Sequence, residues 1–111
     1  MPSGQQVNQI TASLEPKGYQ QFTAGFAGAQ SLSVPAGALV ALIQVNGGGI
    51  RWRDDGTAPT TGAGIFLSGY NTDNVAREVL QYNGDLNALE FIQDAAAGAP
   101  VSVDVSYYAY V

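Results

Sequence analysis

The last stretch of the chain has the most regular pattern of apolar and polar positions. From Val101 to Val111, odd-numbered residues are valine, tyrosine or alanine, whereas Ser, Asp and two tyrosines hold the even positions. An alternation with period two is typical of a β-strand that buries one face. Val101–Val111 is therefore predicted to be a strand, with Tyr108 and Tyr110 on the face opposite its valines.

A second signal is the nearly continuous apolar run Leu39–Val45. A short run of this kind indicates a strand that is buried on both faces. Residues 46–49, Asn-Gly-Gly-Gly, tolerate positive φ cheaply and predict a tight connection to a returning strand, Ile50–Arg53. In that strand Trp52 shares a face with Ile50, which favours a place in the core.

Shorter segments bounded by Gly, Pro, Asn or Asp also favour strands. Residues 75–82 have competing helical spacing, but Asn-Gly-Asp at 83–85 favours a hairpin, so we predict a strand there as well. The segments are Tyr19–Thr23, Ser31–Val34, Ile65–Leu67, Val75–Tyr82 and, after the hairpin, Leu86–Ile92.

About eight short strands without a long amphipathic helix predict an all-β domain. We expect an antiparallel β-sandwich, jelly-roll-like, or a small barrel over residues 18–111. Residues 1–17 are polar and rich in Gln and Ser, and are expected to form an N-terminal arm or a short helix.

Composition narrows the class of partner. Charged residues make up 12% of the chain, about half the usual share. A neutral polar surface costs little to desolvate against a protein neighbour, although a small extracellular or virion domain also needs little charge. The net charge of −5 and the small number of Lys and Arg argue against a nucleic-acid partner.

Two further observations concern the membrane and the compartment. The longest apolar run, Leu39–Val45, is too short to cross a bilayer, so no membrane partner is expected. No basic segment followed by an apolar stretch opens the chain, so we expect it to be made and folded in a cytoplasm.

The sequence contains neither His nor Cys. This excludes Ser/His/Asp and Cys/His catalysis as well as thiolate metal sites. We therefore expect no enzymatic activity, no catalytic residue, no cofactor and no metal.

Acidic residues leave two alternatives open. A carboxylate pair for glycoside hydrolysis would come from Asp54, Asp55, Glu78 and Glu90. Asp54, Asp55 and the Thr57 carbonyl could also hold calcium, which prefers clustered oxygens. Asp before Gly is ordinary turn chemistry, however, so a solvated turn explains this stretch more simply.

Four residues are candidates for a protein interface. Tyr108 and Tyr110 point away from the valine face of their strand, and outward tyrosines are common at interfaces, although a second sheet could also cover them. Arg51 and Arg53 share the other face of their strand. They are either isolated surface charges or forked partners for carboxylates across a subunit boundary.

Three stretches together resemble a family of small virion proteins from tailed bacteriophages. They are Val34–Gln44, Ile50–Thr60 with its Arg-Trp-Arg-Asp-Asp-Gly-Thr-Ala-Pro-Thr block, and Gly84–Ile92, followed by Val105–Tyr108. The resemblance covers about two-thirds of the chain, and its most specific part is the Arg51–Thr60 block.

This resemblance implies a capsid cement, or decoration, protein with a sandwich fold. Such a protein would be made in the host cytoplasm, bind the major capsid protein on the capsid exterior and stabilise capsomer contacts. We expect a homo-oligomer, either dimer or trimer. Two alternatives stay open: a tail, baseplate or head-fibre component, and a carbohydrate-binding β-sandwich that uses Trp52, Tyr108 and Tyr110 as stacking platforms.

Overall fold

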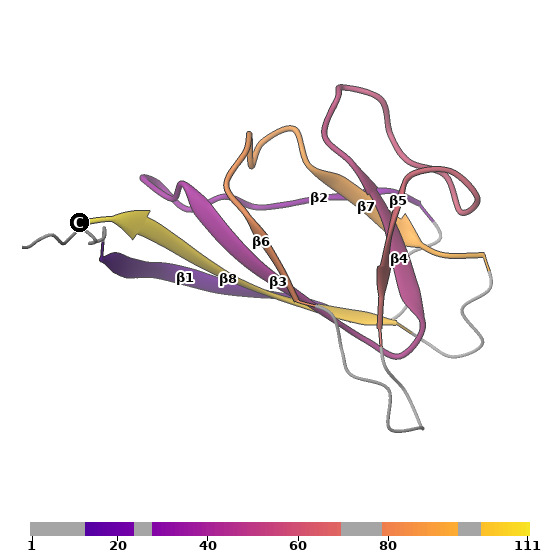
Figure 1. Ribbon diagram of the computed structural model, residues 1–111, viewed down its shortest axis with the longest axis horizontal. Helices are drawn as coiled ribbons and strands as arrows, with labels where there is room; N and C mark the ends of the chain where they lie inside the picture. The colour runs from indigo at the N-terminus through magenta and orange to yellow at the C-terminus, as the bar shows by residue number, and fades with distance from the viewer. Residues whose placement is uncertain (1–12, 24–27, 70–78, 96–100) are drawn as a thin grey trace, which may run out of the picture.

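The fold is a sandwich of two antiparallel sheets, seen in a computed structural model that describes residues 13–23, 28–69, 79–95 and 101–111 (Figure 1). One sheet has the strand order β1-β8-β3-β6 and the other β2-β7-β4-β5. This confirms the predicted all-β class. The strands are β1 (Leu14–Phe22), β2 (Gln30–Ser31), β3 (Val40–Asn46), β4 (Gly49–Arg53), β5 (Ile65–Ser68), β6 (Val79–Tyr82), β7 (Glu90–Gln93) and β8 (Ser102–Tyr110).

The alternation that predicted β8 is also its burial pattern. Its odd-numbered residues, with Val101 just before it, are buried, and its even-numbered residues are partly or largely exposed. β8 lies between β1 and β3, so the main chain on both of its sides is hydrogen-bonded. The strand is therefore held by backbone pairing within its sheet and by side-chain burial between the sheets.

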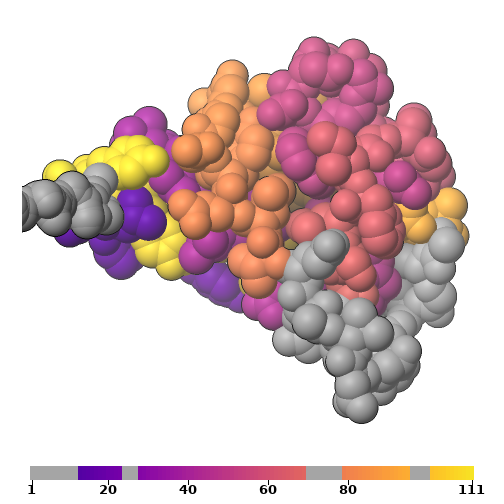
Figure 2. Space-filling model, viewed as in Figure 1, coloured from indigo at the N-terminus to yellow at the C-terminus, as the bar shows by residue number. Residues whose placement is uncertain are grey.

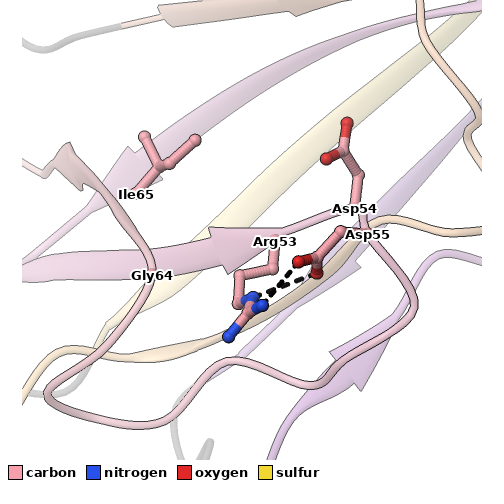
Figure 3. A pocket seen from close by; sticks show the side chains of 5 residues that line it. All are labelled: Arg53, Asp54, Asp55, Gly64 and Ile65. Atoms are coloured by element: carbon pink, nitrogen blue, oxygen red, sulfur yellow. Dashed lines mark hydrogen bonds and ion pairs between the residues drawn. The ribbon is translucent and has the colours of Figure 1, made fainter.

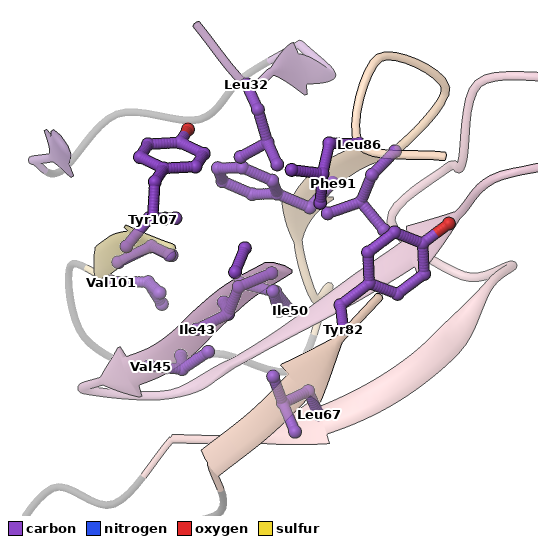
Figure 4. Packing of buried hydrophobic residues seen from close by; sticks show 14 residues of the cluster. Leu32, Ile43, Val45, Ile50, Leu67, Tyr82, Leu86, Phe91, Val101 and Tyr107 are labelled. Atoms are coloured by element: carbon purple, nitrogen blue, oxygen red, sulfur yellow. The ribbon is translucent and has the colours of Figure 1, made fainter. Parts of the chain in front are cut away.

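Side chains from both sheets meet in one core (Figure 4). Ile43 and Tyr107 come from the first sheet, and Ile50 and Phe91 from the second; each is at most 1% exposed. The Phe22 ring packs edge-on against Phe91, with centroids 4.8 Å apart. Burial of apolar side chains on this scale is the main favourable contribution to folding.

Burial of β3 on both faces was predicted and is wrong for most of the strand. Ala41, Ile43 and Val45 face the core, while Leu42 and Gln44 on the other face are half-buried. The second sheet covers the core face of β3. On the outer face, Val40, the partner of Tyr108, is fully buried, whereas the residues that follow it on this face are partly exposed. The apolar run instead reflects a central position in the sheet.

The predicted hairpin at residues 83–85 is wrong, and the strand that follows residues 46–49 does not pair with β3, because each connection crosses from one sheet to the other. β3 is bonded on its two edges to β8 and β6, so the chain passes through Gly47, at φ 93°, into β4 of the second sheet. After β6, residues 83–89 form a turn in which the Asp85 carbonyl accepts a hydrogen bond from the Ala88 amide. Leu86 and Leu89 are buried by this turn rather than by a strand.

Several strand ends also differ from the prediction. β1 begins at Leu14, five residues before the expected Tyr19, because β8 extends far enough to pair Tyr110 with Leu14. β2 is shorter than the expected Ser31–Val34, and β7 begins at Glu90 rather than Leu86. Residues 75–78 and the first twelve residues of the predicted arm lie outside the described residues.

Two isoleucines in strands offer a matched test of this core. Ile43 is 1% exposed and Ile65 is 55% exposed. We expect Ile43→Ala to lower the free energy of unfolding by about 2–5 kcal/mol, because it leaves a cavity between the sheets. Ile65→Ala should cost less than about 1 kcal/mol. Urea denaturation followed by tryptophan fluorescence measures both, and equal losses would contradict the described packing.

Candidate functional site

The four predicted interface residues occupy two different sheets. Arg51 and Arg53 lie on β4, on the face of the second sheet that points away from the core. Tyr108 and Tyr110 lie on β8, on the outer face of the first sheet. The structure therefore divides the predicted interface into two surfaces on opposite sides of the sandwich.

Arg51 is occupied within the chain. Its Nε donates to Asp94 Oδ1 at 2.7 Å, its Nη1 donates to the Gly64 carbonyl at 3.2 Å, and its guanidinium lies 5.1 Å from the centre of the Phe66 ring. These contacts join β4 to β5 and to the end of β7. Arg51 thus makes the directional bonds predicted for an interface, but to its own domain.

Arg53 forms a forked pair with Asp55 in the following turn (Figure 3). The Nε–Oδ1 and Nη2–Oδ2 distances are 3.0 and 2.5 Å. Hydrogen bonding to Arg53 lowers the pKa of the Asp55 carboxyl. The pair borders a depression of about 290 Å³ that Asp54, Gly64 and Ile65 also line.

The calcium and hydrolase alternatives gain no support from this turn. Figure 3 shows the Asp54 carboxylate pointing away from the Arg53–Asp55 pair, and Asp54 accepts a hydrogen bond from the Tyr82 hydroxyl at 2.6 Å. Across the described ranges, no three acidic side chains gather into a possible metal site. Glu78 lies outside the described residues.

The start of β1 and the end of β8 project together at the narrow end of the molecule (Figures 1 and 2), and several apolar residues of these and neighbouring segments are exposed. Tyr110 pairs with Leu14 across the strands, and Leu39 donates its amide to the Tyr108 carbonyl at 2.8 Å. The Val111 amide donates a hydrogen bond to the Ser13 carbonyl at 3.0 Å. We call Leu14, Leu39, Tyr110 and Val111 the tip patch; their exposed fractions are 40, 55, 48 and 81%.

Three members of the tip patch were not predicted from the sequence. Tyr110 was found because the alternation in β8 places it outward. Leu14 lies in the predicted arm, and Leu39 belongs to a run that was assigned to the core. Their position beside Tyr110 depends on the register of β1 and β3 against β8, for which the sequence carries no local signal.

Trp52 is not an exposed platform. It packs against the core, and its ring meets Tyr82 edge-on, with centroids 5.8 Å apart. The described residues include no helix able to span a membrane. Comparison with protein-family models, curated proteins and solved structures finds no match for this chain.

The two arginines predict different responses to the same substitution. Arg51→Lys loses the bonds to Asp94 and Gly64 and the stacking on Phe66, so the free energy of unfolding should fall by about 1–2 kcal/mol. Arg53→Lys should cause no measurable change, because the Arg53–Asp55 pair is exposed. Urea denaturation measures the free energy of unfolding of both variants. A larger loss for Arg53→Lys than for Arg51→Lys would contradict the conclusion that Arg51 stabilises the domain through its internal bonds.

Two buried tyrosines predict a loss of stability at alkaline pH. Burial raises the pKa of Tyr107 to about 12, and burial together with the bond to Asp54 raises that of Tyr82 to about 12. Between about pH 10 and 12 the unfolded chain releases these phenolic protons while the native state keeps them. The free energy of unfolding therefore falls as pH rises through this window and is fully retained below it.

Tyr107→Phe isolates the contribution of one of these tyrosines. Its hydroxyl donates to Gln20 Oε1 at 2.7 Å, so the variant also loses a hydrogen bond at neutral pH. Between pH 10 and 12 the variant should lose roughly 1–2 kcal/mol less than wild type, since one pKa unit corresponds to about 1.4 kcal/mol and solvent screening reduces the effect. Urea denaturation at pH 10 and at pH 12 measures the free energy of unfolding of both proteins. An equal decrease for wild type and Tyr107→Phe between these pH values would refute the prediction.

Proposed function

We propose that this chain is a structural protein of a tailed-phage virion. It binds the major capsid protein on the capsid exterior and stabilises contacts between capsomers, as a cement protein does. The observation that supports a binding role is the tip patch. Leu14 and Tyr110 lie directly opposite each other across β1 and β8, and Leu39 and Val111, which are tied to the same strands, are also exposed in this charge-poor β-sandwich. Exposed apolar side chains that neighbour one another are a feature of protein-binding sites.

The tip patch is suited to binding because its backbone is already ordered. Leu14 and Tyr110 are ends of two nine-residue strands paired along their length, and Leu39 and Val111 are tied to the same strands by main-chain hydrogen bonds. A partner does not have to order this segment when it binds, so less of the interaction energy is lost. Tyr110 supplies the aromatic anchor that is common at the centre of interfaces.

Local charge also favours contact with protein. Glu15 and Lys17, beside Leu14, pair with each other at 3.5 Å, so they add no net charge next to the patch. A small neutral apolar patch forms a weak contact on its own. Repeated over a symmetric capsid lattice, weak contacts reinforce one another through multivalency.

The outer edge of β1 is less suited to binding by strand addition. Pro16 lacks an amide proton, Lys17 adds a charge, and the pairing register with β8 shifts between Pro16 and Gly18. A proline, a charged side chain and a register shift on an edge strand all hinder edge-to-edge pairing of sheets. We therefore assign the capsid contact to the side chains of the tip patch rather than to strand addition at this edge.

Adding the purified protein to capsids assembled without it tests the proposal. Imaging should show density at capsomer junctions, and the decorated capsids should withstand higher temperature than bare ones. Tyr110→Ala should weaken binding about tenfold or more. Tyr19→Ala, which truncates an even more exposed tyrosine of β1 outside the tip patch, is the matched control and should bind like wild type.

Three outcomes would contradict the proposal. Density at the tail or at a single vertex would instead support a tail, baseplate or head-fibre component. Full binding by Tyr110→Ala would remove the tip patch from the contact. Capsids that bind the protein without gaining resistance to heat would argue against a cement role.

A further inference from the structure

The outer face of the first sheet carries a groove that is separate from the tip patch. It has a volume of about 370 Å³, within the range of small-molecule sites. All four strands of the sheet contribute to it. Its main lining residues are Tyr19 of β1, Leu42 and Gln44 of β3, Val79 of β6, and Asp104 and Ser106 of β8.

Tyr19 is an exposed ring held in place by its hydroxyl. The side chain is 65% exposed, yet its hydroxyl donates to Asp104 Oδ1 at 2.7 Å. The other Asp104 oxygen accepts a hydrogen bond from the Asn46 amide at 3.0 Å. Asp104 is therefore fixed from two sides and in turn fixes the ring. An aromatic ring ordered in this way offers an apolar surface with little entropy left to lose.

The groove places hydrogen-bonding groups beside apolar ones. Gln44 contributes an amide that both donates and accepts, and Ser106 contributes a hydroxyl whose lone pairs can accept while it donates to the Tyr108 hydroxyl at 3.1 Å. Leu42 and Val79 add aliphatic surface. A ligand that fits must combine hydroxyl groups with C–H surface.

Other classes of ligand fit less well. Among the residues that the structure describes, the lining contains no Lys or Arg and Asp104 is its one charged residue, which disfavours phosphates and nucleic acids. The main chain of β3 and β8 is paired on both sides along the groove, so an extended peptide cannot bind there by adding a strand.

We propose that this groove binds a neutral saccharide of one or two rings. The C–H face of a sugar ring packs on Tyr19 and the aliphatic side chains, and its hydroxyls exchange hydrogen bonds with Gln44, Ser106 and Asp104. Because the groove is shallow and the ligand small, the dissociation constant should be roughly millimolar. The site shares no residue with the tip patch and does not depend on capsid binding.

Titration of the whole chain with methyl glycosides, followed by ¹H–¹⁵N correlation NMR, tests the site. Uncharged methyl glycosides of glucose, galactose, mannose and N-acetylglucosamine serve as probes. At least one should shift amide signals in the part of β1, β3 and β8 around Tyr19, Gln44 and Asp104. Tyr19→Ala should weaken binding about tenfold or more, whereas Tyr19→Phe, which keeps the ring, should weaken it severalfold at most.

Tyr110→Ala is the control that separates this site from the proposed function. It should bind the glycoside like wild type while losing capsid binding, and Tyr19→Ala should do the reverse. If Tyr19→Ala does not give a dispersed, folded spectrum, Gln44→Ala takes its place and should weaken binding severalfold.

Three results would overturn the saccharide site. One is the absence of a shift with all four glycosides at concentrations well above millimolar. Another is glycoside binding that persists unchanged in Tyr19→Ala or Gln44→Ala. The third is a response of the groove to inorganic phosphate or tetramethylammonium without any response to glycosides, which would assign it to a charged ligand.

Discussion

The structure depends on the pairing of β8 with both of its neighbours. β1 is bonded along one side of it and β3 along the other, so β8 carries most of the hydrogen bonds of the first sheet. Its odd-numbered residues close the core against Ile50, Phe91 and the turn that buries Leu86 and Leu89. β8 is thus an inner strand of its sheet and also contributes one row of side chains to the core. Both roles follow from the strict alternation of apolar and polar residues along it.

The same alternation determines the outer surface. Because odd residues of β8 are buried, its even residues must face outward, Asp104 and Ser106 in the groove and Tyr110 in the tip patch. Neighbouring strands complete each surface, Tyr19 and Gln44 in the groove and Leu14 and Leu39 at the tip. Both proposed binding surfaces therefore rest on the most firmly held strand of the domain. Side chains on a strand that is already ordered lose less conformational entropy when a ligand or partner binds.

Features that depend on local pattern were predictable from the sequence, and features that depend on pairing were not. The period-two pattern identified β8 and the outward direction of Tyr110. The turn-forming segments 46–49 (Asn-Gly-Gly-Gly) and 83–85 (Asn-Gly-Asp) correctly marked reversals of the chain. They did not show that each reversal crosses between sheets, because hairpin rules consider only adjacent strands.

The candidate sites show the same difference: the kind of residue was predictable from the local sequence, but its partners were not. Arg51 was identified as a directional hydrogen-bonding residue, but its partner Asp94 lies 43 positions away and is brought near by the pairing of β4 with β7. Leu14 joins Tyr110 through a register that spans the whole domain. Tyr19 and Asp104, 85 positions apart, meet for the same reason. Single-sequence patterns carry no information on such long-range register.

The central claim is that the tip of the β1–β8 pair, rather than the arginine face of the second sheet, contacts the capsid. A reconstruction of the decorated capsid at side-chain resolution tests it most directly, because it shows which residues become buried. The account predicts that Leu14, Leu39, Tyr110 and Val111 lose their solvent exposure against the major capsid protein. Burial of Arg51 and Arg53 in that contact, with the tip patch left in solvent, would contradict it.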